Sequence, residues 1–210
     1  AGDNPDTGKP LAQPGEIPET PPPAPTVDAS VTLNSVQPNR GPLEGGTLVD
    51  VVGTGFLRYE ANGAPAITLG RNRSSCTNLQ VISDNLIRCL TPPGTLAEAV
   101  TLRLQVFIEP GISAEVILAN AYSYYSPVEL DRIQPSRLPS QSGQRLFVIG
   151  DGFVAGTQVK IAGQNALQVT LLDEETLQVL TPTLPPGLHD VVVSNLNGEA
   201  ILPAALTIYD

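Results

Sequence analysis

The feature of this sequence that most limits its fold is an internal repeat of a glycine- and proline-rich segment. Residues 36–56 read VQPNRGPLEGGTLVDVVGTGF, and residues 133–153 read IQPSRLPSQSGQRLFVIGDGF. At an offset of 97, nine of the twenty positions from 37 to 56 carry the same residue in the second segment. This identity indicates two copies of one structural unit, and its period is too long for a solenoid repeat or a propeller blade.

Each copy contains a series of short strand-like runs separated by turn residues. In the first copy these are VTLNSV, TLVDVV, AITLG, LQVI, AVTLRLQVFI and AEVILANAYSYY. Val, Ile and Thr favour strands, and closely spaced clusters of Gly, Pro, Asn and Asp are typical of antiparallel β-sandwiches. We therefore predict an all-β chain of two immunoglobulin-like sandwiches in tandem, with about seven strands in each.

The first 28 residues differ from the rest in composition. They contain eight prolines and five acidic residues with only scattered aliphatic side chains, which predicts a disordered, partly polyproline-II tether. We expect the first domain at 29–126 and the second at 127–210. The last strand of the first copy leads almost directly into the second copy, so we expect a semi-rigid head-to-tail rod.

Charge and hydropathy exclude some classes of protein. The net charge is −10, from 21 acidic against 11 basic residues, and this argues against nucleic-acid binding. No apolar run approaches the roughly 20 residues of a membrane helix. The sequence contains no methionine, so we expect a processed or trimmed piece of a longer precursor.

The two cysteines, Cys76 and Cys89, allow buried thiols, a disulfide or half of a metal site. Zinc sites usually need four ligands, and His189 is the only histidine, which disfavours a metal. When the two copies are aligned, Cys89 falls opposite Val179 and Cys76 falls near Val169, so apolar residues replace both. We favour a disulfide between them, which would imply an oxidising compartment.

The order of these motifs resembles the IPT/TIG family of immunoglobulin-like domains. In the first copy the resemblance lies in VQPNRGPLEGGT, VVGTGF, IRCLTP and YSYY, and in the second copy in IQPSRLPSQSG, VIGDGF, TLQVLTPTLPPG and DVVVSNLNG. It covers residues 31–210 and implies an immunoglobulin-like fold and a role as a module, without naming a ligand. The family's frequent cysteine pair matches Cys76 and Cys89 in the first copy only.

The glycines of VVGTGF and VIGDGF invite comparison with a phosphate-binding loop. Such a loop precedes a helix and usually ends in Gly-Lys-Ser/Thr, and neither copy continues in that way. We predict that these glycines allow a positive φ or a bulge where a strand ends. Phe56 and Phe153 should then turn inward to fill the core.

Few side chains suggest chemistry, and we expect no catalytic residue, cofactor or metal. His189 reads as a surface histidine, and Asp173-Glu174-Glu175 as a solvated turn. Arg71 and Arg73 lie in a locally basic loop that either contacts an anionic partner or is simply solvated.

Tyr122 and Tyr124 fall on one face of a strand near the junction of the copies. They either pack in the core and against the neighbouring domain, or form an exposed aromatic platform for a sugar ring.

These observations predict a non-enzymatic module that mediates protein–protein interaction or acts as a structural spacer. We expect it at a cell surface or in the periplasm, in a bacterial envelope, as a lipoprotein attached to the membrane only through an upstream anchor. The alternative is a glycan-binding accessory module of a polysaccharide-acting system. The partner would then be another protein or a glycan, and not nucleic acid.

Overall fold

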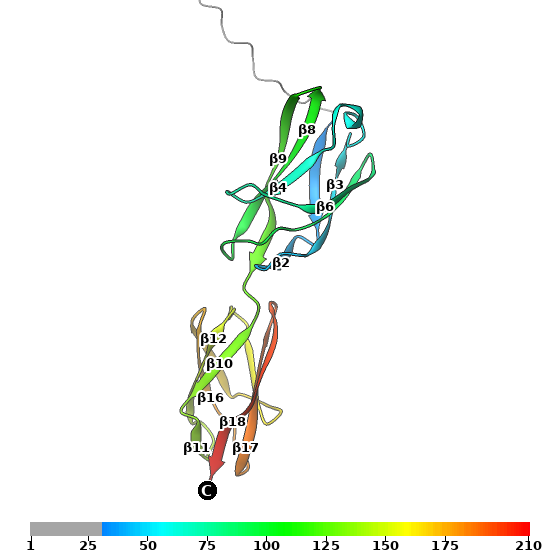
Figure 1. Cartoon of the computed structure of the whole chain (residues 1–210). Coiled ribbons are helices and arrows are strands. Elements are labelled where there is room, and N and C mark those ends of the chain that lie inside the picture. Colours follow the sequence, from blue (N-terminus) through cyan, green and yellow to red (C-terminus); the bar gives the residue numbers. More distant parts are fainter. Residues whose placement is uncertain (1–30) are drawn as a thin grey trace, which may run out of the picture.

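The computed structural model describes residues 31–210, which form two all-β domains joined end to end (Figure 1). The predicted tether at 1–28 lies outside the described residues. The only helical turn in the described part is the 3-10 helix η1 (Glu60–Asn62). The all-β class and the tandem arrangement are therefore confirmed.

The first domain packs a four-stranded sheet, in the order β1-β3-β7-β6, against a five-stranded sheet, β2-β9-β8-β4-β5. Its strands are β1 (Thr32–Gln37), β2 (Arg40–Pro42), β3 (Leu48–Thr54), β4 (Ala66–Leu69), β5 (Ser74–Ser75), β6 (Thr77–Ser83), β7 (Leu86–Leu90), β8 (Ala99–Glu109) and β9 (Ile112–Tyr125).

The second domain repeats this topology, with sheets in the order β10-β12-β16-β15 and β11-β18-β17-β13-β14. Its strands are β10 (Glu129–Gln134), β11 (Arg137–Pro139), β12 (Arg145–Asp151), β13 (Gln158–Ile161), β14 (Gln164–Asn165), β15 (Gln168–Asp173), β16 (Thr176–Leu180), β17 (Gly187–Asn195) and β18 (Gly198–Tyr209). In each domain one pair is parallel, β2 with β9 and β11 with β18, and all other pairs are antiparallel.

Each domain has its own core, built from strand residues that alternate between inside and outside. In the first domain Val49 and Val51 of β3 face Cys89 and Ile87 of β7, and all four are fully buried. The second domain buries the corresponding side chains Leu146, Val148, Leu177 and Val179. The domains are therefore two separately packed sandwiches, as the internal repeat predicts.

The repeated glycine motif shapes the backbone in two ways. Gly55 and Gly152 have φ of +75° and +73°, which favours glycine. Gly53 has an ordinary φ, but a Cβ there would overlap the Thr32 carbonyl oxygen of β1. No α-helix follows either motif in residues 31–210; the first motif is followed only by the three-residue 3-10 helix η1. Phe56 and Phe153, at 2% and 0% exposure, fill the cores as predicted.

Candidate functional site

The junction between the domains is short and is built into both of them. β9 ends at Tyr125 and β10 begins at Glu129, which leaves three residues in the connection. The last of these, Val128, is only 7% exposed and belongs to the core of the second domain. The chain therefore has few free dihedral angles in which the domains could turn relative to each other.

Arg40 of β2 bridges the two domains. Its guanidinium carbon lies 4.4 Å from the centroid of the Tyr125 ring, within cation–π range. From this position Nη2 donates to Oδ1 of Asn197 at 2.6 Å, and Nη1 donates to the carbonyl oxygen of Leu196 at 3.3 Å. The first domain thus holds the β17–β18 turn of the second by a stacked and hydrogen-bonded arginine, a geometry that a lysine would not reproduce.

The turn that Arg40 holds is itself fixed by asparagine side chains. Asn195 accepts a hydrogen bond from the backbone N–H of Asn197 at 2.6 Å and donates to the Gly152 carbonyl at 2.9 Å. Gly152 in turn lies so close to the connection that a Cβ there would overlap the carbonyl oxygens of Pro127 and Ser126. Arg40 and its partners therefore form one polar network across the junction, which we call the Arg40 clamp (Arg40, Tyr125, Gly152, Asn195, Leu196 and Asn197).

A cavity of about 240 Å³ lies beside the Arg40 clamp and is lined by both domains. Its walls include Ala97 and Tyr124 from the first domain and Phe153 and Glu174 from the second. The domain contact is thus made at a few specific points and is not a continuous packed interface.

The structure buries the two tyrosines that the sequence offered as an aromatic platform. Tyr122 is fully buried and Tyr124 is 5% exposed, with ring centroids 5.1 Å apart at an interplanar angle of 74°. The Tyr124 hydroxyl donates to the Pro92 carbonyl oxygen at 2.6 Å, and burial raises the pKa of this tyrosine. An exposed platform is therefore wrong for Tyr122, and both rings instead pack in the first domain, as the alternative interpretation predicts.

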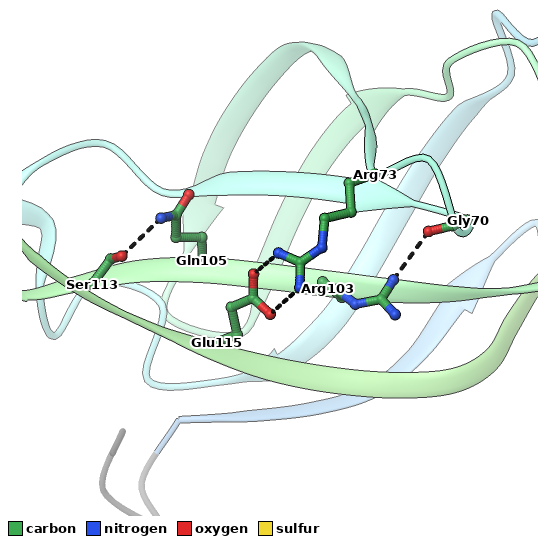
Figure 2. A network of polar contacts seen from close by, with 6 residues as sticks. All are labelled: Gly70, Arg73, Arg103, Gln105, Ser113 and Glu115. Atoms are coloured by element: carbon green, nitrogen blue, oxygen red, sulfur yellow. Dashed lines mark hydrogen bonds and ion pairs between the residues drawn. The ribbon is translucent and has the colours of Figure 1, made fainter. Parts of the chain in front are cut away.

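The two arginines of the basic loop are not equivalent. Arg73 forms a bidentate ion pair with Glu115 of β9 (Figure 2). The loop is also held by Arg103 of β8, which donates to the Gly70 carbonyl oxygen at 3.0 Å. Arg71 is exposed and lines a groove of about 180 Å³ that also contains Glu98. Glu115 thus pairs with the charge of Arg73, and contact of Arg71 or Arg73 with an anionic partner remains a prediction.

The two cysteines lie side by side as thiols. Cys89 is fully buried, Cys76 is partly buried, and a hydrogen bond between them together with burial raises the pKa of Cys76. The sequence comparison misplaced the counterpart of Cys76. The backbone N–H of Cys76 donates to the Ile67 carbonyl as that of Ala166 donates to Val159, both at 2.9 Å. The counterpart is therefore Ala166 and not Val169, because four residues join β4 to β5 whereas only two join β13 to β14, and this difference changes the offset between the copies before Cys76 is reached.

Residues 31–210 contain no group of three His, Cys, Asp or Glu side chains placed to hold a metal ion. His189 of β17 is half-buried, and its Nε2 lies 2.7 Å from the Pro185 carbonyl oxygen. The described part also lacks any helix that is both long and apolar enough to cross a membrane.

Sequence reasoning missed the Arg40 clamp. Arg40 is one of the nine positions that the copies share, so its identity with Arg137 indicated a role in both domains. In the second domain Arg137 lies 5.8 Å from the ring centroid of Tyr209, which repeats the stacking of Arg40 on Tyr125. The contact of Arg40 with Asn197 is not repeated, and no signal in the sequence pairs these two residues.

Comparison with known proteins identifies the repeated unit. Residues 32–123 and 127–208 each match the family described as IPT/TIG domain.

Among solved structures, the extracellular region of plexin A4 is 16% identical and covers 86% of this chain and 16% of its own, with a TM-score of 0.39. SGBP-B from a complex xyloglucan utilization locus in Bacteroides uniformis is 17% identical over 84% of this chain and 49% of its own, with a TM-score of 0.38. The surface glycan-binding protein PbSGBP-B from Prevotella bryantii is 14% identical. The match covers 81% of this chain and 41% of that protein, also with a TM-score of 0.38. This chain spans less than half of each of them, and likenesses at this distance say nothing about what it binds.

Proposed function

The chain belongs to the IPT/TIG family of immunoglobulin-like domains, and on that premise we propose that it is a non-enzymatic spacer and interaction module. Its two domains act as one unit that sets the distance and angle between the structures attached at its ends. Partner proteins would contact the outer faces and loops of this unit.

The Arg40 clamp is the observation that carries this proposal. A chain whose domains are only tethered needs no side chain that reaches from one domain to a loop of the other. In this chain the Arg40 guanidinium stacks on Tyr125 and bonds two groups of the Leu196–Asn197 turn. The three-residue connection and the buried Val128 support the same function, because they limit the turning of one domain against the other.

Backbone ¹⁵N relaxation of the wild-type protein tests the spacer function. If the two domains tumble as one body, residues in β3 and in β12 will report the same rotational correlation time. That time will be the value expected for the pair and not for a single domain. Two separate, shorter correlation times would contradict the proposal.

We also propose that the module works at a bacterial cell surface or in the periplasm, where the adjacent Cys76 and Cys89 form a disulfide. The contact between their thiols supports this pairing, and an oxidising compartment would allow it. Attachment as a lipoprotein stays a prediction from the sequence.

The test of this pairing is intact-mass analysis after alkylation without reductant, on protein secreted through an oxidising compartment. The expected result is no alkylation without reductant and two added groups after reduction. Two alkylated thiols before reduction, in denatured protein, would contradict the disulfide.

A further inference from the structure

The outer face of the sheet β10-β12-β16-β15 carries a groove of about 660 Å³. The residues that line it come from three neighbouring strands and two turns: Arg132, Gln134, Pro135, Phe147, Ile149, Glu175 and Thr176. They alternate along the strands with the buried core residues Ile133, Val148 and Leu177, so they point away from the core. The groove is therefore a surface feature of the second domain and lies apart from the Arg40 clamp.

Strand register arranges the groove as an apolar centre between polar rows. Phe147 pairs with Gln134 on one side and with Gln178 on the other. Ile149 pairs in the same way with Arg132 and Thr176. A half-buried aromatic ring beside an aliphatic side chain is thus flanked by two amides, a hydroxyl and a guanidinium, all of which can form hydrogen bonds.

The first domain shows that the fold does not require this arrangement. At the positions of Phe147 and Gln178 it has Asp50 and Arg88, which pair across β3 and β7. Nε of Arg88 donates to Oδ1 of Asp50 at 2.7 Å, so an ion pair covers the centre of this face. The aromatic groove is therefore a property of the second domain alone, and not a consequence of building an IPT/TIG sandwich.

The position of the groove limits what could occupy it. The apolar centre of the groove lies on β12, an inner strand with neighbours on both sides, so the backbone there is already paired and cannot receive an added peptide strand; only the rim of the groove reaches the edge strand β10. A ligand must instead lie across the strands and bind through side chains.

The charges of the groove indicate a neutral ligand. The groove contains one cation, Arg132, and one anion, Glu175, whose charges cancel. What the groove offers is an apolar strip with hydrogen-bonding groups on both sides. A sugar ring matches this chemistry, because its C–H face packs on an aromatic ring while its hydroxyls bond amides, carboxylates and guanidinium groups.

We propose that this face of the second domain binds a neutral saccharide chain, with the ring of Phe147 as its platform. Gln134 and Gln178 donate to and accept from the sugar hydroxyls, and Arg132 and Glu175 bond those at the rim. The proposal does not rest on the spacer function, because no residue of the Arg40 clamp lines the groove.

Affinity electrophoresis of the full chain in native gels tests the proposal. The probes are four soluble neutral polysaccharides (hydroxyethylcellulose, galactomannan, arabinoxylan and dextran), with polygalacturonate as the anionic comparison. We expect at least one neutral polysaccharide to retard the wild-type protein. The Phe147→Ala variant should bind that polysaccharide about tenfold more weakly, because it loses both the apolar area and the ring face.

Leu188→Ala provides the matched control, since Leu188 is 65% exposed on β17 of the other sheet and lies outside the groove. This variant should bind like wild type. Gln178→Ala, which leaves the ring in place, should weaken binding by a smaller factor, and circular dichroism spectra and melting curves must show that each variant is folded. Retardation that is equal in wild type and Phe147→Ala, retardation by polygalacturonate alone, or no retardation by any probe would overturn the proposal.

Discussion

At the scale of single residues, the two buried tyrosines of β9 differ in the hydrogen bonding of their hydroxyl groups. Tyr124 donates its hydroxyl to the Pro92 carbonyl oxygen, whereas the Tyr122 hydroxyl is buried without a hydrogen-bond partner among the described residues. A buried polar group that makes no hydrogen bond costs free energy, and one that makes a bond stabilises the fold. The hydroxyls of neighbouring rings should therefore contribute with opposite signs.

Replacing each tyrosine by phenylalanine tests this difference. Tyr122→Phe should raise the free energy of unfolding by about 1 kcal/mol, and Tyr124→Phe should lower it by about 1 kcal/mol and leave the Pro92 carbonyl unpaired. Denaturant unfolding followed by circular dichroism measures both, and each variant is the control for the other. A loss of stability in Tyr122→Phe equal to that in Tyr124→Phe would show that the Tyr122 hydroxyl has a partner.

Gly152 and Gly143 have similar backbone conformations but different surroundings, so they can be compared with each other. Both have positive φ, +73° and +76°, but only at Gly152 would a Cβ overlap the connection between the domains. Gly143→Ala should therefore cost about 1 kcal/mol of unfolding free energy, for its φ alone. Gly152→Ala should cost about 1 to 3 kcal/mol more, because Pro127 and Ser126 must move.

Urea denaturation of the two glycine variants under identical conditions measures this difference. Equal losses of stability would mean that the approach of Gly152 to the connection does not constrain the junction.

At the scale of strands, the same cross-strand position carries an ion pair in the first domain and an aromatic–amide pair in the second. In β3 and β7 the hydrogen bond from Arg88, and its charge, hold the pKa of Asp50 below the ordinary value of 3.8. The ionised Asp50 is favoured in the folded state, so the ion pair stabilises the fold at pH values above the pKa that Asp50 has in the unfolded chain. This stabilisation is lost as the pH falls through the lower pKa that Asp50 has in the folded protein.

An NMR titration of the Asp50 side-chain carboxyl carbon checks this sign. The midpoint should lie below 3.8 in wild type and should rise toward that value in Arg88→Ala. Because the side chains are 35% and 41% exposed, water screens the pair and its effect on stability should be small. A midpoint at or above 3.8 in the wild-type protein would contradict the assigned ion pair.

Sequence patterns predicted most of the longer strands and the inward-facing Phe56 and Phe153, and they failed where elements are short or irregular. The long alternating run of β8 carries a clear signal, because every second residue from Val100 to Val106 is buried. The pieces β2, β5, β11 and β14 have only two or three residues, too few to show a period, and they bring each domain to nine strands instead of about seven. The β4–β5 turn is two residues longer than the β13–β14 turn, and the sequence gives no clear signal of this difference, so Cys76 was aligned near Val169 and not with Ala166.

At the scale of the whole molecule, the repeat predicted the duplicated fold but not the contact between its copies. A repeat shows what the two domains have in common, whereas the contact at the junction depends on which residues of the other domain lie within reach. Arg40 and Arg137 are identical and both stack on a tyrosine, yet only Arg40 has an asparagine from a neighbouring domain within reach. The candidate platform at Tyr122 failed because alternation shows that Tyr122 and Tyr124 share a face of the strand but not that this face is turned into the core of the first domain.

The groove of the second domain likewise depends on a difference between the copies. At the offset of 97 Phe147 stands opposite Asp50, and no role for Phe147 was predicted from the sequence. Only the register with Gln134 and Gln178 shows that its ring lies on the outer face. Residues that differ at matching positions of a repeat are therefore one place to search for a function that belongs to a single domain.

If Arg40 holds the two domains in one fixed orientation, residual dipolar couplings will report it. Couplings are measured for both domains in wild type, in Arg40→Ala and in the matched control Arg137→Ala, which removes the same stacking from the far end of the second domain. One alignment tensor should fit both domains in wild type and in Arg137→Ala. In Arg40→Ala the domains should require separate tensors of unequal magnitude, because Asn197 and Leu196 lose their partner. A single tensor that fits both domains equally well in Arg40→Ala would contradict the account.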